Sequence, residues 1–205
     1  PERIEGGILG SVVPALTGRV LGALRMFCSA RFLTVGPGLK SGIKLRLDNP
    51  AQLGAELLCG AVAALEEGPG PLAVISADTA ISIMAVNGKQ ELVGGVILPG
   101  PQLSLSALVQ KTAQLPQIDL SAPASSSILG KNTSACLQNG FVLGTAGLLD
   151  GLAERFQAEL GPDIRFYATG NLPRTIREAC RTPIQYREYL ITDGLYRIWQ
   201  KNRKG

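Results

Sequence analysis

Apolar residues in this chain fall into short blocks separated by glycine and proline, and the spacing within each block predicts an element of secondary structure. Near the start, compact apolar blocks at residues 7–13 and 32–38 predict strands, and a further short strand is expected at 42–47. Between the first two blocks, apolar positions recur at helical spacing over residues 15–27 and predict a helix.

The strongest helix signal follows at residues 49–67. Asn49 is suited to cap this helix, Pro50 to its first turn, and Gly68 to its end. Apolar side chains at helical spacing predict that one side of the helix belongs to the core: Leu53, Leu57, Ala61, Ala64 and Leu65.

Proline and glycine interrupt both neighbouring patterns at residues 67–72, and we interpret this stretch as a domain boundary. It divides the chain into predicted domains 1–70 and 71–205. Asn87-Gly88 predicts a type I′ turn between two strands of a hairpin unit. The strands of that unit are expected at residues 72–76, 81–86 and 91–100.

The rest of the chain mixes helices with a single strand. Helices are expected over residues 104–114, 130–161 and 187–202, and a strand over 163–170. The first of these helices opens on a serine, and glycines in the second predict either close helix contacts or a break. Hairpin-joined strands followed by alternating helices and strands predict an α/β fold with a mixed sheet.

Composition favours a soluble globular protein, because 45% of the 205 residues are hydrophobic and 18% are charged. No apolar run approaches the length of a membrane span. The net charge is +4, but the basic residues gather at the C-terminal end and aromatic residues make up only 5% of the chain. A nucleic-acid partner is therefore not expected.

The chain contains no histidine, which excludes Ser-His-Asp and Cys-His catalysis and metal sites that use histidine. Its four cysteines form no C-x-x-C pair, so a reduced, cytoplasmic protein without structural zinc fits best. Cys59 and Cys136 lie in apolar or small-residue surroundings and are expected to be buried. Any catalysis must therefore use carboxylates, lysines, hydroxyls or backbone dipoles.

The order of several segments resembles type III pantothenate kinases. They are "GPGLKSGIKLRLDNPAQLGAE", "DTAISIMAVNGKQELVGGVILPG", "ALVQKTAQLPQIDL", "ILGKNT" and "YATGN…YLITDGLYRIWQKN", and they cover essentially the whole chain. The resemblance implies the two-domain sugar kinase/actin-like fold, which is ribonuclease H-like. The family's first phosphate-binding hairpin has no counterpart, so the first domain is expected to be incomplete in this chain, with the C-terminal helix packing back on it.

The resemblance also implies a reaction, in which the γ-phosphoryl group of ATP passes to pantothenate and gives 4′-phosphopantothenate for coenzyme A synthesis. The family implies Mg²⁺, a monovalent cation (K⁺ or NH₄⁺) and a cytoplasmic homodimer whose pantothenate pocket is completed across the dimer interface.

One substrate-binding segment of the family reads Gly-Ala-Asp-Arg, with the aspartate as general base and the arginine as carboxylate ligand. This chain has Gly54-Ala55-Glu56-Leu57 at that place. Glu56 is able to accept a proton, although its extra methylene displaces the carboxylate. Leu57 offers nothing to an anion and is equally well explained as a core residue.

The hairpin at residues 74–88 has the layout of a phosphate-binding loop, and the resemblance assigns it to ATP. The family pattern Asp-x-Gly-Thr appears here as Ser76-Ala77-Asp78-Thr79. Thr79 is the expected ATP ligand. Ser76 replaces the cation-binding carboxylate, and Asp78 supplies a carboxylate two residues later, facing the same way if the strand continues.

Two further segments carry over from the family. Thr133 in Gly-Lys-Asn-Thr matches the family's pantothenate-contacting threonine, while Asn132 is also a candidate helix cap. The turn after Tyr167 matches the adenine end of the site, with Asn171 in place of a glycine.

Three functions remain open from the sequence. The first is an ATP-dependent pantothenate kinase with Glu56 as its base. The second is a catalytically degraded relative that serves as a binding or regulatory protein, as the changes at Leu57 and Ser76 suggest. The third is a kinase for a related alcohol that lacks a carboxylate, which the loss of the arginine at position 57 favours.

Overall fold

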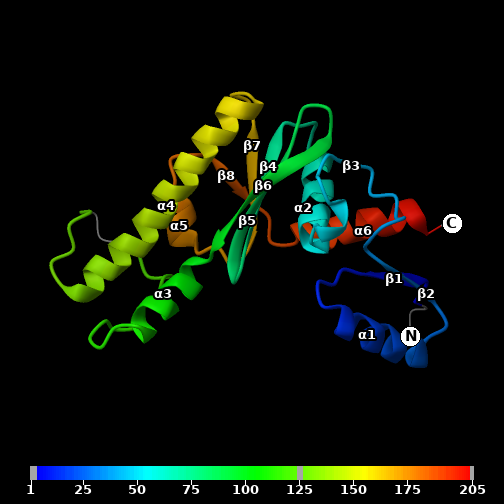
Figure 1. Cartoon of the computed structure of the whole chain (residues 1–205), viewed down its shortest axis with the longest axis horizontal. Coiled ribbons are helices and arrows are strands. Elements are labelled where there is room, and N and C mark those ends of the chain that lie inside the picture. The colour runs from blue at the N-terminus through cyan, green and yellow to red at the C-terminus, as the bar shows by residue number, and fades with distance from the viewer. Residues whose placement is uncertain (1–3, 124–126, 204–205) are drawn as a thin grey trace.

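The computed structural model describes residues 4–123 and 127–203. A small unit opens the chain, in which the parallel strands β1 (Gly6–Leu9) and β2 (Arg31–Thr34) are joined by helix α1 (Pro14–Phe27). This unit lies at one end of the molecule, beside helix α6 (Figure 1). The predicted helix at 15–27 and the first two strands are therefore confirmed.

A six-stranded mixed sheet forms the centre of the molecule, with strand order β3-β6-β5-β4-β7-β8. β4, β5 and β6 form the antiparallel hairpin unit expected from the apolar blocks, and parallel pairings add β3, β7 and β8. The strands are β3 (Lys44–Leu45), β4 (Leu72–Ala77), β5 (Ala80–Val86), β6 (Glu91–Pro99), β7 (Arg165–Gly170) and β8 (Ile184–Tyr186).

Helices cover both faces of this sheet (Figure 1). On one face, α2 (Ala55–Glu66) and α6 (Leu190–Asn202) share a core with inward residues of β4 such as Leu72 and Val74. On the other face, α4 (Thr133–Leu160) and α5 (Arg174–Ala179) pack with the alternate residues Ala73 and Ile75. Because strand side chains alternate, apolar residues at successive positions of β4 supply both cores.

Close backbone contact joins α2 to α6. A methyl group on Gly194 of α6 would collide with the carbonyl oxygen of Cys59 in α2, so only glycine allows this approach. Gly60 lies similarly close to Val74 of the sheet, where an added methyl carbon would be 3.0 Å from a valine methyl carbon. Cys59 is fully buried between these elements, as expected.

The helix expected from Asn49 onward is broken into two pieces. The Asn49 side chain does cap a start, accepting the backbone N–H of Ala51 at 3.2 Å, but it begins the 3₁₀ helix Pro50–Gln52. Leu53 and Gly54 then adopt extended backbone angles, and α2 begins at Ala55. The end was predicted correctly, since Gly68 takes a positive φ of 141° after the last turn.

The expected type I′ turn at Asn87-Gly88 is wrong. The positive backbone angle falls on Gln90 (φ 58°) rather than on Gly88, and the Asn87 side chain accepts the N–H groups of Lys89 and Glu91. The asparagine therefore organises a longer loop through its side chain.

Other local differences concern helices and cysteines. Helix α3 (Pro101–Gln110) begins earlier than expected, because Pro101 occupies its first turn after Gly100. Helix α4 is unbroken through its glycines, and a methyl group added at Gly140, Gly144, Gly147 or Gly151 would meet no other element. Cys136 is exposed on α4, contrary to expectation.

No described helix combines the length and apolar character needed to cross a membrane.

Candidate active site

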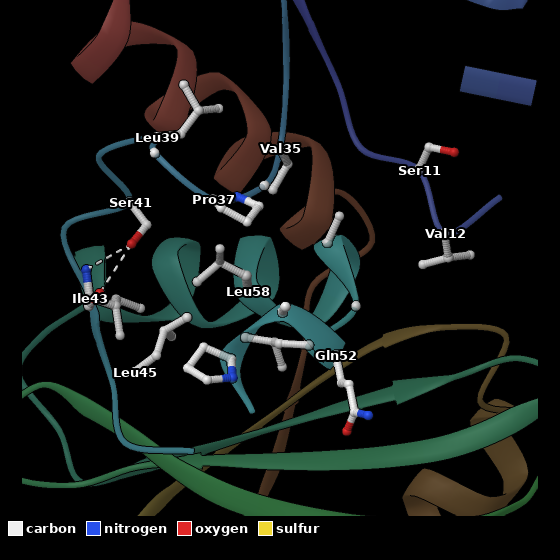
Figure 2. A pocket seen from close by; sticks show the side chains of 17 residues that line it. Ser11, Val12, Val35, Pro37, Leu39, Ser41, Ile43, Leu45, Gln52 and Leu58 are labelled. Atoms are coloured by element: carbon white, nitrogen blue, oxygen red, sulfur yellow. Dashed lines mark hydrogen bonds between the residues drawn. The ribbon is translucent and has the colours of Figure 1, made fainter. Parts of the chain in front are cut away.

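A cavity of about 520 Å³ opens at the N-terminal end of α2. The segment 35–45 forms one wall, the 3₁₀ helix and the start of α2 form another, and the loop after β1 closes a third side (Figure 2). Six large aliphatic residues contribute to the lining: Val35, Leu39, Ile43, Leu45, Leu53 and Leu58.

A second cavity of about 200 Å³ adjoins the first, because Ser11, Val12 and Ala55 line both. Glu56 lines only the smaller cavity, from an exposed position in the first turn of α2. A carboxylate in a first turn is stabilised by the helix dipole. The paired cavities therefore offer a proton acceptor beside an apolar chamber.

The structure separates the four residues of the Gly54–Leu57 segment, which were expected to bind substrate together. Gly54 and Ala55 line the larger cavity, and Glu56 lines the smaller one. Leu57 lines neither, since it is 8% exposed and belongs to the core shared by α2, α6 and the sheet. Leu57 points away from the cavities although it follows Glu56 directly, because successive helix positions are about 100° apart.

The expected ATP and cation residues lie at the tip of the β4–β5 hairpin. Strand β4 ends at Ala77, and the Asp78 N–H donates to the carbonyl of Ala80 at 2.9 Å, so the strand does not continue through Asp78. Asp78 and Thr79 are exposed and line a third cavity of about 400 Å³. Ser76 is 8% exposed and lines neither this cavity nor the two cavities beside α2.

Asn171 joins the tip of this hairpin to the end of β7. Its side-chain nitrogen donates to Asp78 Oδ1 at 2.8 Å, and its backbone N–H donates to the Ala77 carbonyl. Gly170 makes the turn possible with a φ of 81°, and Tyr186 donates to the Gly170 carbonyl at 2.9 Å. Sequence reasoning noted the residue change at Asn171 but not this bond.

Thr133 lies away from Glu56. It is the first residue of α4, exposed, with Asn132 capping the helix by accepting the N–H of Ala135 at 2.9 Å. Because α4 covers one face of the sheet and α2 the other, the two residues of one chain do not meet in a common cavity (Figure 1).

Asp150 and Cys59 are two ionisable groups whose surroundings shift their pKa. Burial acts to raise the pKa of Asp150, but the N–H groups of Arg181 and Thr182 donate to its carboxylate and the net pKa is lowered. Burial raises the pKa of the Cys59 thiol to about 12. The contacts of both groups stabilise the fold, and neither group lines the larger cavity.

Comparison with known proteins connects this geometry to a family. Residues 1–155 match the sequence pattern of type III pantothenate kinase. The type III pantothenate kinase of Koribacter versatilis (strain Ellin345) is 36% identical over 200 residues, which cover 98% of this chain and 72% of that protein. The chain belongs to the type III pantothenate kinase family.

A second type III pantothenate kinase, from an Exiguobacterium species, is 34% identical over 203 residues, covering 99% of this family member and 79% of its relative. Among solved structures, a Campylobacter jejuni protein of the Baf family, described as a transcriptional activator, superposes with a TM-score of 0.59. That comparison covers 99% of this chain and 86% of the other at 17% identity. The expected actin-like α/β fold of this pantothenate kinase relative is thereby confirmed.

Proposed function

We propose that this protein is an ATP-dependent kinase that phosphorylates the 4′-hydroxyl group of pantothenate, the first step towards coenzyme A. The observation that carries the proposal is Glu56, an exposed carboxylate in the small cavity that adjoins the apolar chamber at the start of α2. Family membership supplies the reaction class.

In the proposed reaction, the acceptor hydroxyl lies against Glu56 and its carbon chain extends into the larger cavity. The Glu56 carboxylate takes the hydroxyl proton as the hydroxyl oxygen bonds to the γ-phosphorus of ATP. The bond between that phosphorus and the β,γ-bridging oxygen breaks, and ADP leaves. In phosphoryl transfer the base acts chiefly by orienting the nucleophile. A glutamate carboxylate is able to do this even though its extra methylene shifts it from the position of an aspartate.

For the nucleotide, we propose the hairpin tip as the phosphate site, with Thr79 donating its hydroxyl hydrogen to a phosphate oxygen. The exposed Asp78 carboxylate would by itself repel the phosphates of ATP. It is suited to hold a Mg²⁺ ion between itself and those phosphates. When bound, the ion would neutralise phosphate charge. Ser76 does not fit the monovalent cation of the family, because its hydroxyl is buried and neutral and does not line the cavity at the hairpin tip.

We further propose that the protein works in the cytoplasm as a homodimer, with Thr133 reaching the pantothenate pocket of its partner. The placement of Thr133 on the sheet face opposite α2 supports this arrangement, since within one chain it is remote from Glu56. A pocket shared between two copies gives Thr133 a role that one copy does not allow.

A second candidate is a catalytically degraded relative that binds a ligand or regulates another process. The burial of Leu57 in the core favours it, because the family's carboxylate ligand is absent from the cavity. The fold similarity to a Baf family protein is compatible with either candidate.

The deciding experiment is pantothenate-dependent ADP formation by the full-length gene product with Mg²⁺ and K⁺ or NH₄⁺ present. Turnover that falls at least about a hundredfold in Glu56→Gln supports the kinase, since that variant keeps the shape but loses the proton acceptor. The matched control Glu66→Gln removes an acidic group at the other end of α2 and should leave the rate unchanged. A folded protein without turnover would favour the binding protein.

A further inference from the structure

The loop at residues 36–42 forms part of the wall of the larger cavity, and the last turn of helix α6 contacts it. We propose that Asn202 in that turn is a positioning residue for pantothenate, because it keeps the loop in the arrangement that forms the cavity. The inference rests on the proposed function for the identity of the ligand. It assigns to the cavity a residue that lies 162 positions beyond its partner in the loop.

The composition of this loop makes its shape costly to fix. Its Gly38 and Gly42 have positive φ angles of 92° and 86°. Within the loop, the Leu39 N–H donates to the Gly36 carbonyl at 3.3 Å. Glycine loses more conformational freedom on ordering than any other residue, so contacts from outside the loop contribute strongly to its shape. The loop residues that line the cavity are Gly36, Pro37, Gly38, Leu39 and Ser41.

The Asn202 side chain binds both backbone groups of Lys40. Its Oδ1 accepts the Lys40 N–H at 3.0 Å, and its Nδ2 donates to the Lys40 carbonyl at 3.0 Å. The same Nδ2 donates to the Ile198 carbonyl, one turn earlier in α6, at 2.7 Å. An amide carries a donor and an acceptor on one planar group, whereas a carboxylate only accepts and an aliphatic side chain does neither. Asparagine therefore matches this position chemically.

Helix α6 is a firm base for this contact. Its Ile198 is fully buried, and its Gly194 lies against the Cys59 carbonyl of α2. A second bond to the loop comes from Lys201, whose ammonium group donates to the Ser41 carbonyl at 3.3 Å. Figure 2 shows the loop residues beside the red ribbon of α6. Because α2 forms another wall of the cavity, these bonds fix one wall relative to the other.

This arrangement has a consequence for binding. A ligand that needs the loop in place has an apparent affinity reduced by the fraction of molecules in which the loop is in place. Loss of the Asn202 contact lowers that fraction, so pantothenate should bind more weakly while the bound substrate reacts as before. ATP is proposed to bind at the hairpin tip, where Asp78 and Thr79 line a different cavity, so its affinity should not change.

The test uses Asn202→Leu in the full-length protein, which removes the donor and the acceptor at nearly constant size. Calorimetry should show a Kd for pantothenate about tenfold higher, and the KM for pantothenate should rise by a similar factor. The kcat and the KM for ATP should change less than about twofold. Asn202→Gln keeps both polar groups and should recover most of the affinity.

Amide hydrogen exchange of residues 36–43 provides a second readout. The Lys40 N–H should exchange faster in Asn202→Leu, because its acceptor is gone. The matched control is Gln200→Leu, which removes an amide that bonds to Arg197 on the same helix and should change neither readout. Faster exchange with an unchanged affinity for pantothenate would make the contact merely structural and overturn the inference. An equal loss of affinity in Gln200→Leu would also overturn it.

The two proposals fail separately. If the native protein binds pantothenate without phosphorylating it, and Asn202→Leu binds it about tenfold more weakly, the inference stands and the kinase proposal falls. If the native protein phosphorylates pantothenate and Asn202→Leu keeps the native KM, the kinase stands and the inference falls. Absence of pantothenate binding by the native protein would overturn both.

Discussion

Glu56 and Leu57 are neighbours in the chain, yet one turn of α2 assigns them to different surroundings. Glu56 is exposed at a cavity, whereas Leu57 is packed into the core beneath the helix. Leu57 therefore belongs to the scaffold of the protein.

We predict that Leu57→Arg destabilises the protein by about 2–4 kcal/mol instead of restoring a carboxylate site, because it places a charge in the apolar core. Urea unfolding followed by circular dichroism measures the change. Glu56→Arg, with the same new side chain on the exposed side, should cost only about 1 kcal/mol, because it places a positive charge at the N-terminal end of the helix dipole but leaves the core intact. Equal stability of the two variants would contradict the assignment of Leu57 to the core.

Asp150 is a second residue whose role is structural. Its carboxylate is 3% exposed and accepts the N–H groups of Arg181 and Thr182 at 3.0 and 2.8 Å. Asp150→Ala leaves both donors without their acceptor and should cost about 2–4 kcal/mol.

The same bonds predict a pH dependence. Because the folded state lowers the pKa of Asp150, its contribution is complete above the pKa of the unfolded state, about 3.9. It is lost as the pH falls through the lower folded value. The stability difference between the native protein and Asp150→Asn should therefore shrink as the pH is lowered from about 7 to 3. A constant difference across that interval would show that the charged form is not favoured by folding.

At the scale of elements, the contact between α2 and α6 depends on glycine. Gly194→Ala should destabilise the protein by about 1–3 kcal/mol, because the new methyl group must push α6 away from the Cys59 carbonyl. Gly147→Ala on α4 is the matched control. It meets no neighbouring element and should stabilise its helix by up to about 1 kcal/mol. Thermal unfolding of both variants distinguishes these opposite signs, and a stabilising Gly194→Ala would refute the close packing.

Sequence patterns predicted most elements because their cause is local. The apolar blocks of β4 and β5 are continuous since these strands are covered on both faces of the sheet, and Asn132 is a local cap. The break at Leu53 and Gly54 was missed, because apolar spacing does not register a change of backbone angle. The hydrogen bond between Asn171 and Asp78 could not be predicted from local patterns, because it joins residues 93 positions apart.

At the scale of the whole molecule, the proposed site needs two copies of the chain. Each copy contributes Glu56 from one face of its sheet and Thr133 from the other. Such a dimer has two identical sites related by its two-fold axis, and each site combines Glu56 of one copy with Thr133 of the other.

Complementation between inactive variants tests this arrangement. Glu56→Gln and Thr133→Ala should each be nearly inactive alone. After the two are mixed and exchanged in equal amounts, about one quarter of the sites recover both native residues, since half of the dimers are mixed and each mixed dimer has one intact site. Activity is measured against time after mixing. If mixing restores none, the pocket is not shared between copies.

The buried thiol of Cys59 allows local unfolding around α2 to be followed by chemical labelling. A thiol reagent attacks the thiolate, and this group is fully enclosed with a pKa of about 12, so it reacts only when α2 separates from the sheet and α6. With Cys28, Cys136 and Cys180 replaced by serine, the ratio of its labelling rate to that of a free thiol gives the free energy of that separation. The free energy of opening of the helix that carries Glu56 can thus be measured in native buffer, without denaturant and without a substrate.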